Sequence, residues 1–196
     1  MRYVTCVCAS LLLFSFLSCN SGGDGSTPTA GELIDQGWQS YSSRSYQAAL
    51  DKFNEALGMD GSLVDGYNGA GWASAKLNQL STSLAKLTTG LSKDTSNLEI
   101  KAALAIVYNA QRTYAQSISF ANRVLAVRPN WSFSHDATVS AADLHLLLAE
   151  DYFAMANYNA SLVEVKALNP AFDADVSAVH GQAALAGEIE RLRSIV

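Results

Sequence analysis

The sequence predicts an all-α fold, a solenoid of stacked helical hairpins, because one side-chain pattern recurs every 34 residues. Residues of similar kind recur at this spacing in four series: Gly37, Gly71 and Ala105; Leu50, Leu84 and Ile118; Leu57, Leu91 and Leu125; Tyr46, Leu80 and Tyr114. A fixed period of this length is typical of helix–turn–helix repeats, each too small to bury its own apolar face. Such stacks present binding surfaces, so the pattern predicts a kind of molecule and leaves its partner open.

The N-terminal segment resembles an export signal and is not expected to be part of the fold. After Arg2, residues 4–17 are almost wholly apolar or small, a run shorter than the roughly 20 residues that span a bilayer. The run ends in Phe16-Leu17-Ser18-Cys19, which resembles a bacterial lipobox, although Phe16 stands where that motif usually has Leu. The resemblance implies a signal peptide over residues 1–18 and lipidation of Cys19. The alternative is an ordinary cleaved signal in which Cys19 is incidental.

The other two cysteines, Cys6 and Cys8, would be removed with the signal, which leaves no second cysteine for an internal disulfide. Residues 19–31 are rich in Gly, Ser and Thr and predict a flexible tether. The lipobox resemblance thus implies a lipid-anchored protein of the bacterial cell envelope. The outer membrane, on its periplasmic or surface face, is the expected location.

The charge balance argues against nucleic acid as a partner. The chain has 13 basic and 18 acidic residues, and loss of Arg2 with the signal leaves 12 against 18, a net charge of −6. No basic cluster occurs, so neither a nucleic-acid site nor a polybasic membrane patch is expected. Residues 32–196 have the length of one ordinary domain.

The first unit covers residues 30–63, with a turn between two helices before Tyr46. Its small and bulky positions are Leu33, Gly37, Tyr41, Tyr46, Ala49, Phe53, Ala56 and Leu57. This spacing resembles the tetratricopeptide repeat (TPR), in which small residues let paired helices approach and aromatic residues fill the space between pairs. The aromatic residue of the first helix is shifted one place, to Tyr41, and Gly61 replaces the usual Pro.

The second and third units cover residues 64–97 and 98–131. They keep the pattern at Tyr67, Gly71, Leu80, Ser83, Leu84, Leu87, Gly90 and Leu91, and at Leu104, Ala105, Tyr108, Tyr114, Ile118, Leu125 and Pro129. The period of 34 favours TPR over HEAT and armadillo repeats, whose period is about 40 or more.

The fourth unit, residues 141–168, is displaced by ten residues, which places an insertion at 131–140. Ser140 and Asp143 predict a helix start, so helices are expected over 141–155 and 158–168, the second ending before Pro170. Residues 169–196 predict a capping helix, from about 173 to 194, with an apolar stripe that closes the stack. The stripe consists of Leu185, Ile189, Leu192 and Val196.

In the TPR family, defined positions of the first helix of each unit line the concave groove. The resemblance implies a protein-binding groove at Trp38, Tyr41, Asn68, Trp72, Asn109 and Phe153. Lys76 is the only base at these positions, which favours a neutral, aromatic or mildly basic segment over a carboxylate tail. For Trp38 and Trp72 the alternative is packing between adjacent helices, since large aromatic residues are mostly buried.

We expect neither catalytic activity nor a bound metal or cofactor. The sequence has no catalytic or cofactor-binding motif, and His135, Asp136 and His145 match no familiar metal spacing, so no cofactor or metal is predicted. In the insertion, Trp131 and Phe133 are expected to fold onto the fourth unit; the alternative is an exposed contact.

The predicted function is a non-enzymatic adaptor or scaffold at the cell envelope, anchored by lipid and bound to a protein or peptide partner. Two alternatives stay open: a self-associating structural subunit, which would form homo-oligomers, and an enzyme with a metal at His135, Asp136 and His145.

Overall fold

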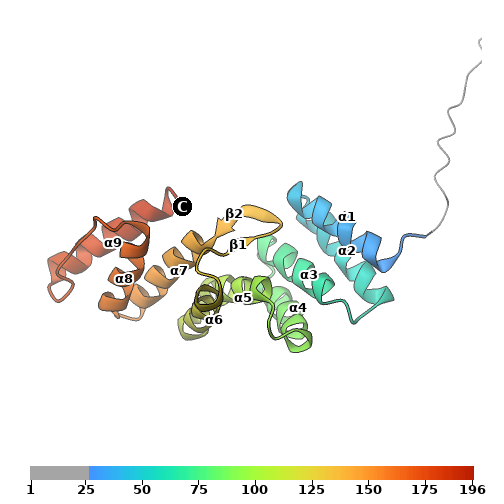
Figure 1. Ribbon diagram of the computed structural model, residues 1–196, viewed down its shortest axis with the longest axis horizontal. Coiled ribbons are helices and arrows are strands. Elements are labelled where there is room, and N and C mark those ends of the chain that lie inside the picture. Colours follow the sequence, from blue (N-terminus) through green and yellow to red (C-terminus); the bar gives the residue numbers. More distant parts are fainter. Residues whose placement is uncertain (1–26) are drawn as a thin grey trace, which may run out of the picture.

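The computed structural model describes residues 27–196, and its helices follow a curve with one β hairpin on the inner side (Figure 1). The predicted signal peptide and Cys19 lie outside the described residues. Thr29 and Glu32 form a capping box that starts the first helix at Ala30. The last two residues assigned to the 19–31 tether are therefore helical.

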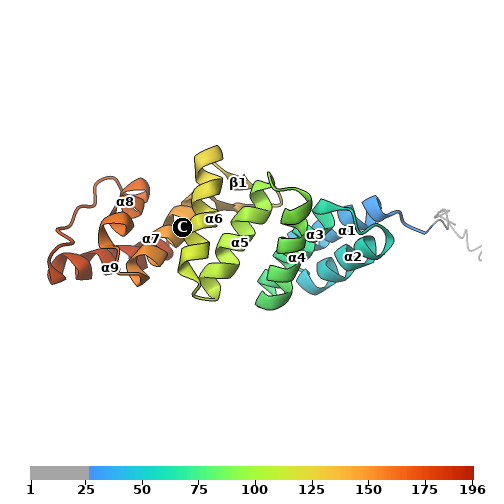
Figure 2. The same cartoon turned by 90° about the horizontal axis from the view of Figure 1, so that it is seen from below.

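Four helical hairpins and a final helix form the stack in the described part of the chain, which confirms the predicted all-α solenoid. The hairpins are α1–α2 (Ala30–Ser42, Tyr46–Met59), α3–α4 (Val64–Lys76, Leu80–Lys93), α5–α6 (Leu98–Ala110, Tyr114–Val127) and α7–α8 (Ala141–Ala154, Tyr158–Leu168), followed by α9 (Val179–Arg193). Figure 2 shows these pairs side by side along the long axis. Within residues 27–196, no helix is both long enough and apolar enough to cross a bilayer.

The turn inside each hairpin contains one residue in the left-handed conformation. Arg44, Asn78, Arg112 and Ala156 have φ angles of 57° to 59° and share one place in the repeat. In the first turn the Ser45 N–H donates to the Ser40 carbonyl at 2.9 Å, and the other three turns repeat this bond. Such a bond satisfies a carbonyl at the end of the first helix of each hairpin. None of the four residues is glycine, so composition alone did not mark these turns.

Close packing between hairpins centres on Phe53 of α2. Phe53 is fully buried, and a Cβ atom added to Gly37 of α1 or Gly69 of α3 would lie within 2.6 Å of its ring. Both glycines therefore face the ring, and their lack of a side chain lets three helices meet around it.

Residues 131–140 form a β hairpin rather than the loop expected from sequence. Strand β1 (Ser132–Phe133) pairs antiparallel with β2 (Asp136–Ser140), and the Ala141 N–H donates to the Trp131 carbonyl at 2.7 Å below the strands. Ser140 then caps α7 through a capping box with Asp143, as predicted.

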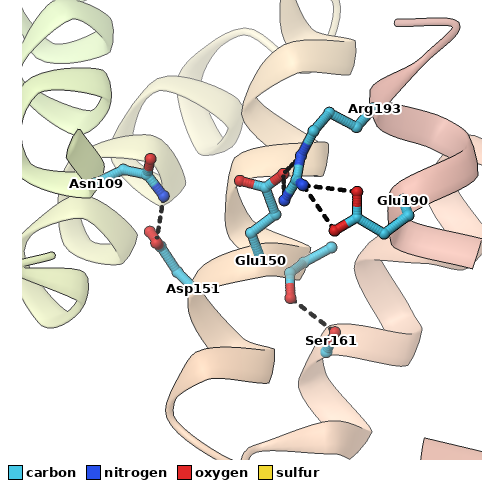
Figure 3. Close-up of polar contacts among 7 residues, drawn as sticks. Asn109, Glu150, Asp151, Ser161, Glu190 and Arg193 are labelled. Carbon is cyan, nitrogen blue, oxygen red and sulfur yellow. Dashed lines mark hydrogen bonds and ion pairs between the residues drawn. The ribbon is translucent and has the colours of Figure 1, made fainter. Parts of the chain in front are cut away.

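The C-terminal helix is shorter than predicted, since residues 169–178 form turns and α9 begins at Val179. Its buried residues Leu185, Ile189 and Leu192 pack with Leu146 and Val165 of the fourth hairpin. Arg193 donates to Glu150 of α7 and to Glu190, as Figure 3 shows. The cap thus combines three residues of the predicted apolar stripe with a polar edge; the fourth, Val196, lies beyond α9 and is 41% exposed.

A buried carboxyl group links the third and fourth hairpins. Asp151 of α7 is 0% exposed, and the Asn109 side-chain amide of α5 donates to its Oδ1 at 2.7 Å (Figure 3). Burial raises the pKa of Asp151 to about 6; Ser117 and Asn109 oppose this rise, and the neighbouring Glu150 adds to it. The folded protein consequently holds the proton of this carboxyl more tightly than the unfolded chain does.

Replacing Phe53 by Ala should cost about 3–5 kcal/mol of unfolding free energy, because a fully buried ring leaves a cavity between hairpins. Urea denaturation followed by circular dichroism measures the cost. Gly69→Ala tests whether the glycine faces the ring. Its added methyl group should collide with Phe53 in the wild type, but should fit the cavity that Phe53→Ala leaves. Additive effects of the two substitutions would contradict the packing described here.

Asp151→Asn should stabilise the protein at pH 7.5 and have little effect near pH 4. The folded-state pKa of about 6 exceeds the ordinary value of 3.8, so the wild type loses stability as pH rises from about 4 through 6; the loss is of the order of 2–3 kcal/mol. Urea denaturation at both pH values measures the difference, with Asp35→Asn on the exposed side of α1 as the charge control. A pH-independent difference would show that Asp151 is not the titrating group.

Candidate functional site

The hairpin tip lies against three of the predicted groove residues. The Phe133 ring stacks on Trp72 of α3 at 4.2 Å between centroids and 18° between planes. Its edge contacts are to Trp38 at 5.9 Å and Tyr41 at 6.0 Å, both on α1. The three residues form an aromatic cage around Phe133, which is buried. Such edge and stacked pairs stabilise beyond the area they bury.

A second ring contact holds the turn of the hairpin. His135 stacks on Trp38 with centroids 3.5 Å apart and an interplanar angle of 2°. Trp38 is itself fixed, because its Nε1–H donates to Asp65 Oδ2 of α3 at 3.0 Å. This hydrogen bond between the first two hairpins fixes the orientation of the indole and does not involve the insertion.

Polar groups on α3 and α5 contact the same tip. Glu99 of α5 accepts hydrogen bonds at Oε1 from the Ser134 N–H, at 3.1 Å, and from the Ser134 hydroxyl. Its Oε2 accepts from Asn68 Nδ2 at 2.8 Å, and Lys76 Nζ lies 3.7 Å from Asp136 Oδ2. One carboxylate and one ammonium thus bind main-chain and side-chain groups of the hairpin turn.

Electrostatics at the tip favour an ionised carboxylate. Hydrogen bonds from Thr138 lower the pKa of Asp136, burial opposes them, and the charges of Lys76 and Arg44 lower it further. Burial raises the pKa of Tyr41, to which the charge of Asp136 adds. The Tyr41 hydroxyl is buried and has no hydrogen-bond partner among residues 27–196.

The predicted groove residues divide into two groups. Trp38, Tyr41 and Trp72 meet at Phe133, and Asn68 joins them through Glu99. Trp38 is 7% exposed and Trp72 is 2% exposed, because the hairpin covers them. Whether these residues bind a partner stays a prediction; in this structure their neighbour is the chain's own insertion.

Asn109 and Phe153 lie apart from the cage. Asn109 is engaged with Asp151, and Phe153 lines a cavity of about 280 Å³ between α7 and α9. The cavity wall is completed by Glu150, Ile189 and Arg193. The six predicted residues therefore do not form one continuous site.

An open cavity of about 290 Å³ adjoins the hairpin. Its lining comes from α3, α5, the second strand and α7: Trp72, Ala75, Lys76, Ile106, Val139 and Asp143. We call the surface formed by Trp38, Tyr41, Trp72, Lys76 and Glu99, together with this cavity, the concave groove. The hairpin fills its N-terminal part and leaves the remainder accessible.

The expected fold-back of the insertion onto the fourth unit is wrong for Phe133, which packs on the first and second hairpins instead. The physical reason is that Trp38, Tyr41 and Trp72 together give the Phe133 ring three aromatic neighbours. Sequence analysis also missed Ser134 and His135 as contacts of the groove residues. The only sequence signal was the pair of large aromatic residues, Trp131 and Phe133, in the insertion.

The residues of the metal hypothesis have separate neighbours. His135 stacks on Trp38, Asp136 faces Lys76, and His145 Nδ1 lies 2.7 Å from Glu164 Oε2. Over residues 27–196, no three His, Cys, Asp or Glu side chains gather in a way that could hold a metal ion.

Comparison with known proteins supports the fold. No protein-family model and no curated protein sequence matches the chain. Among solved structures, one of MamA is 11% identical, with a TM-score of 0.64 over 84% of this chain and 95% of that one. A thermophilic TPR protein in Thermus thermophilus is 19% identical, with a TM-score of 0.57 over 85% and 89%.

A TPR protein from Parabacteroides merdae is 15% identical, with a TM-score of 0.59; the match covers 84% of this chain and 60% of that one. At these identities the likeness concerns the fold alone. Together with the 34-residue period and the paired helices, it assigns the architecture: this chain is a TPR-type helical solenoid.

Proposed function

We propose that the chain is a non-enzymatic adaptor or scaffold that binds a protein partner through the concave groove while a lipid at Cys19 holds it at the bacterial cell envelope. The observation that carries the binding part is the aromatic cage, which accepts a side chain from the turn of the hairpin. Large aromatic residues around a desolvated pocket are typical anchors of protein interfaces.

The accessible cavity supplies a surface for the partner. Ile106 and Ala75 give it an apolar floor, and Lys76 and Asp143 give it charged edges. An apolar centre with a polar rim is the usual composition of a recognition surface. The anchoring part rests on the apolar run of residues 4–17 and on Cys19 at its end.

Cys19→Ser should move the protein from the membrane fraction to the soluble fraction of cells, because the lipidated atom is lost. Mass spectrometry of the wild-type N-terminal peptide should show a lipid on Cys19 and cleavage after Ser18. A wild-type protein that is cleaved but carries no lipid would support the ordinary signal and remove the anchor from the proposal.

Ile106→Glu should abolish capture of a partner by residues 20–196 from envelope extract, since it places a charge in the apolar floor of the cavity. Val127→Glu is the matched control, because Val127 is 69% exposed on α6. Pull-down with quantitative mass spectrometry measures capture, and circular dichroism confirms that both variants are folded.

Loss of the partner with Val127→Glu alone would place the interface away from the groove. Absence of any partner, with self-association in sedimentation velocity, would instead favour a self-associating subunit. Either result would overturn the groove proposal.

A further inference from the structure

The hairpin tip contacts the concave groove as a bound peptide would. Over residues 133–136 one ring enters the cage, one main-chain N–H meets a carboxylate, a second ring stacks on an indole and one carboxylate faces a lysine. All four contacts join the turn of the hairpin, in which Phe133 pairs with Asp136 across two turn residues, to helices that precede it in sequence. An aromatic anchor together with charge-assisted hydrogen bonds is a usual way for a binding groove to recognise a peptide segment.

The tip is not part of the repeating helical pattern. Residues 131–140 stand between the third and fourth hairpins, outside the 34-residue pattern. The stem is anchored separately, because Trp131 and Val139 are buried and Ser140 caps α7. The tip can therefore leave the groove while the stem and α7 keep their places.

The strand pairing of the hairpin and its ion pair contribute little to holding the tip in the groove. The first strand has only two residues, and two-stranded hairpins are marginally stable on their own. Lys76 and Asp136 are partly exposed, so their 3.7 Å pair contributes little. Phe133 is the main anchor, and the adjoining cavity shares Trp72 with the cage, so a competing chain can approach beside the tip.

We propose that residues 133–136 are an intramolecular ligand of the concave groove. The external partner is then a protein segment that forms the same tight turn, with an aromatic residue followed, three residues later, by a carboxylate, and that displaces the tip. This inference rests on the proposed function and deepens it. It also replaces the neutral or mildly basic segment expected from sequence, because the carboxylate of Asp136 is the group that Lys76 faces.

The test uses a fluorescent peptide with the sequence of residues 131–140 and measures its binding by anisotropy. Protein in which Phe133→Ala vacates the cage should bind the peptide at least about tenfold more tightly than wild type, because the internal competitor is weakened. Ser132→Ala, on the exposed side of the same strand, is the matched control and should behave as wild type. A peptide that itself carries Phe133→Ala should not bind.

A second variant covers the case in which Phe133→Ala fails to fold, which its thermal melt would show. Ser134→Ala/Asp136→Asn removes the polar contacts of the tip and leaves the buried ring in place. This variant should also bind the wild-type peptide more tightly than wild-type protein does. Equal binding to wild type and to a folded variant would overturn the proposal, as would dimers of the vacated protein that ignore the peptide.

The two proposals can fail separately. Tighter peptide binding without a groove-dependent partner in envelope extract would keep the internal ligand and overturn the adaptor function. A partner lost with Ile106→Glu, together with equal peptide binding throughout, would keep the adaptor and overturn the internal ligand.

Discussion

The stack depends on the close approach of helices at positions that carry no side chain. Phe53 fills the space that Gly37 and Gly69 leave free, and Leu87 meets Gly71 in the same manner one repeat later. Because neighbouring hairpins meet at this short distance, the first helices of successive repeats follow one another along the inner side of the curve. That order brings Trp38 and Trp72 to one surface, on which the aromatic cage is built.

The repeat period predicted the helices well because it reports burial, which is local to each hairpin and its neighbour. α8 begins and ends at Tyr158 and Leu168 as predicted, and Ser140 caps α7. The left-handed turns escaped prediction, since Arg44 and Ala156 occupy a conformation for which glycine is the usual sign. Hydrogen bonds within the turn, rather than residue type, impose it.

The sequence predicted that three of the candidate residues lie together; their role in binding stays a prediction. Positions on the first helices placed Trp38, Tyr41 and Trp72 together, because a helical repeat aligns equivalent residues. The occupant could not be predicted, since the pairing of Phe133 with residues of the first repeat has no periodicity and joins distant parts of the chain. Asn109 instead donates to the buried carboxyl of Asp151, and Phe153 lines the cavity between α7 and α9.

The same insertion changes how the solenoid resists unfolding. In an ordinary repeat array each unit contacts only its neighbours, so the ends can fray while the middle stays folded. Here His135 and Phe133, which follow the third repeat, lie against Trp38 in the first. This contact closes a long loop, and the first three repeats should therefore lose structure together rather than one by one. A partner that displaces the tip from the groove would also remove this contact, and the repeats could then unfold one by one. Occupancy of the groove and the cooperativity of unfolding are therefore coupled.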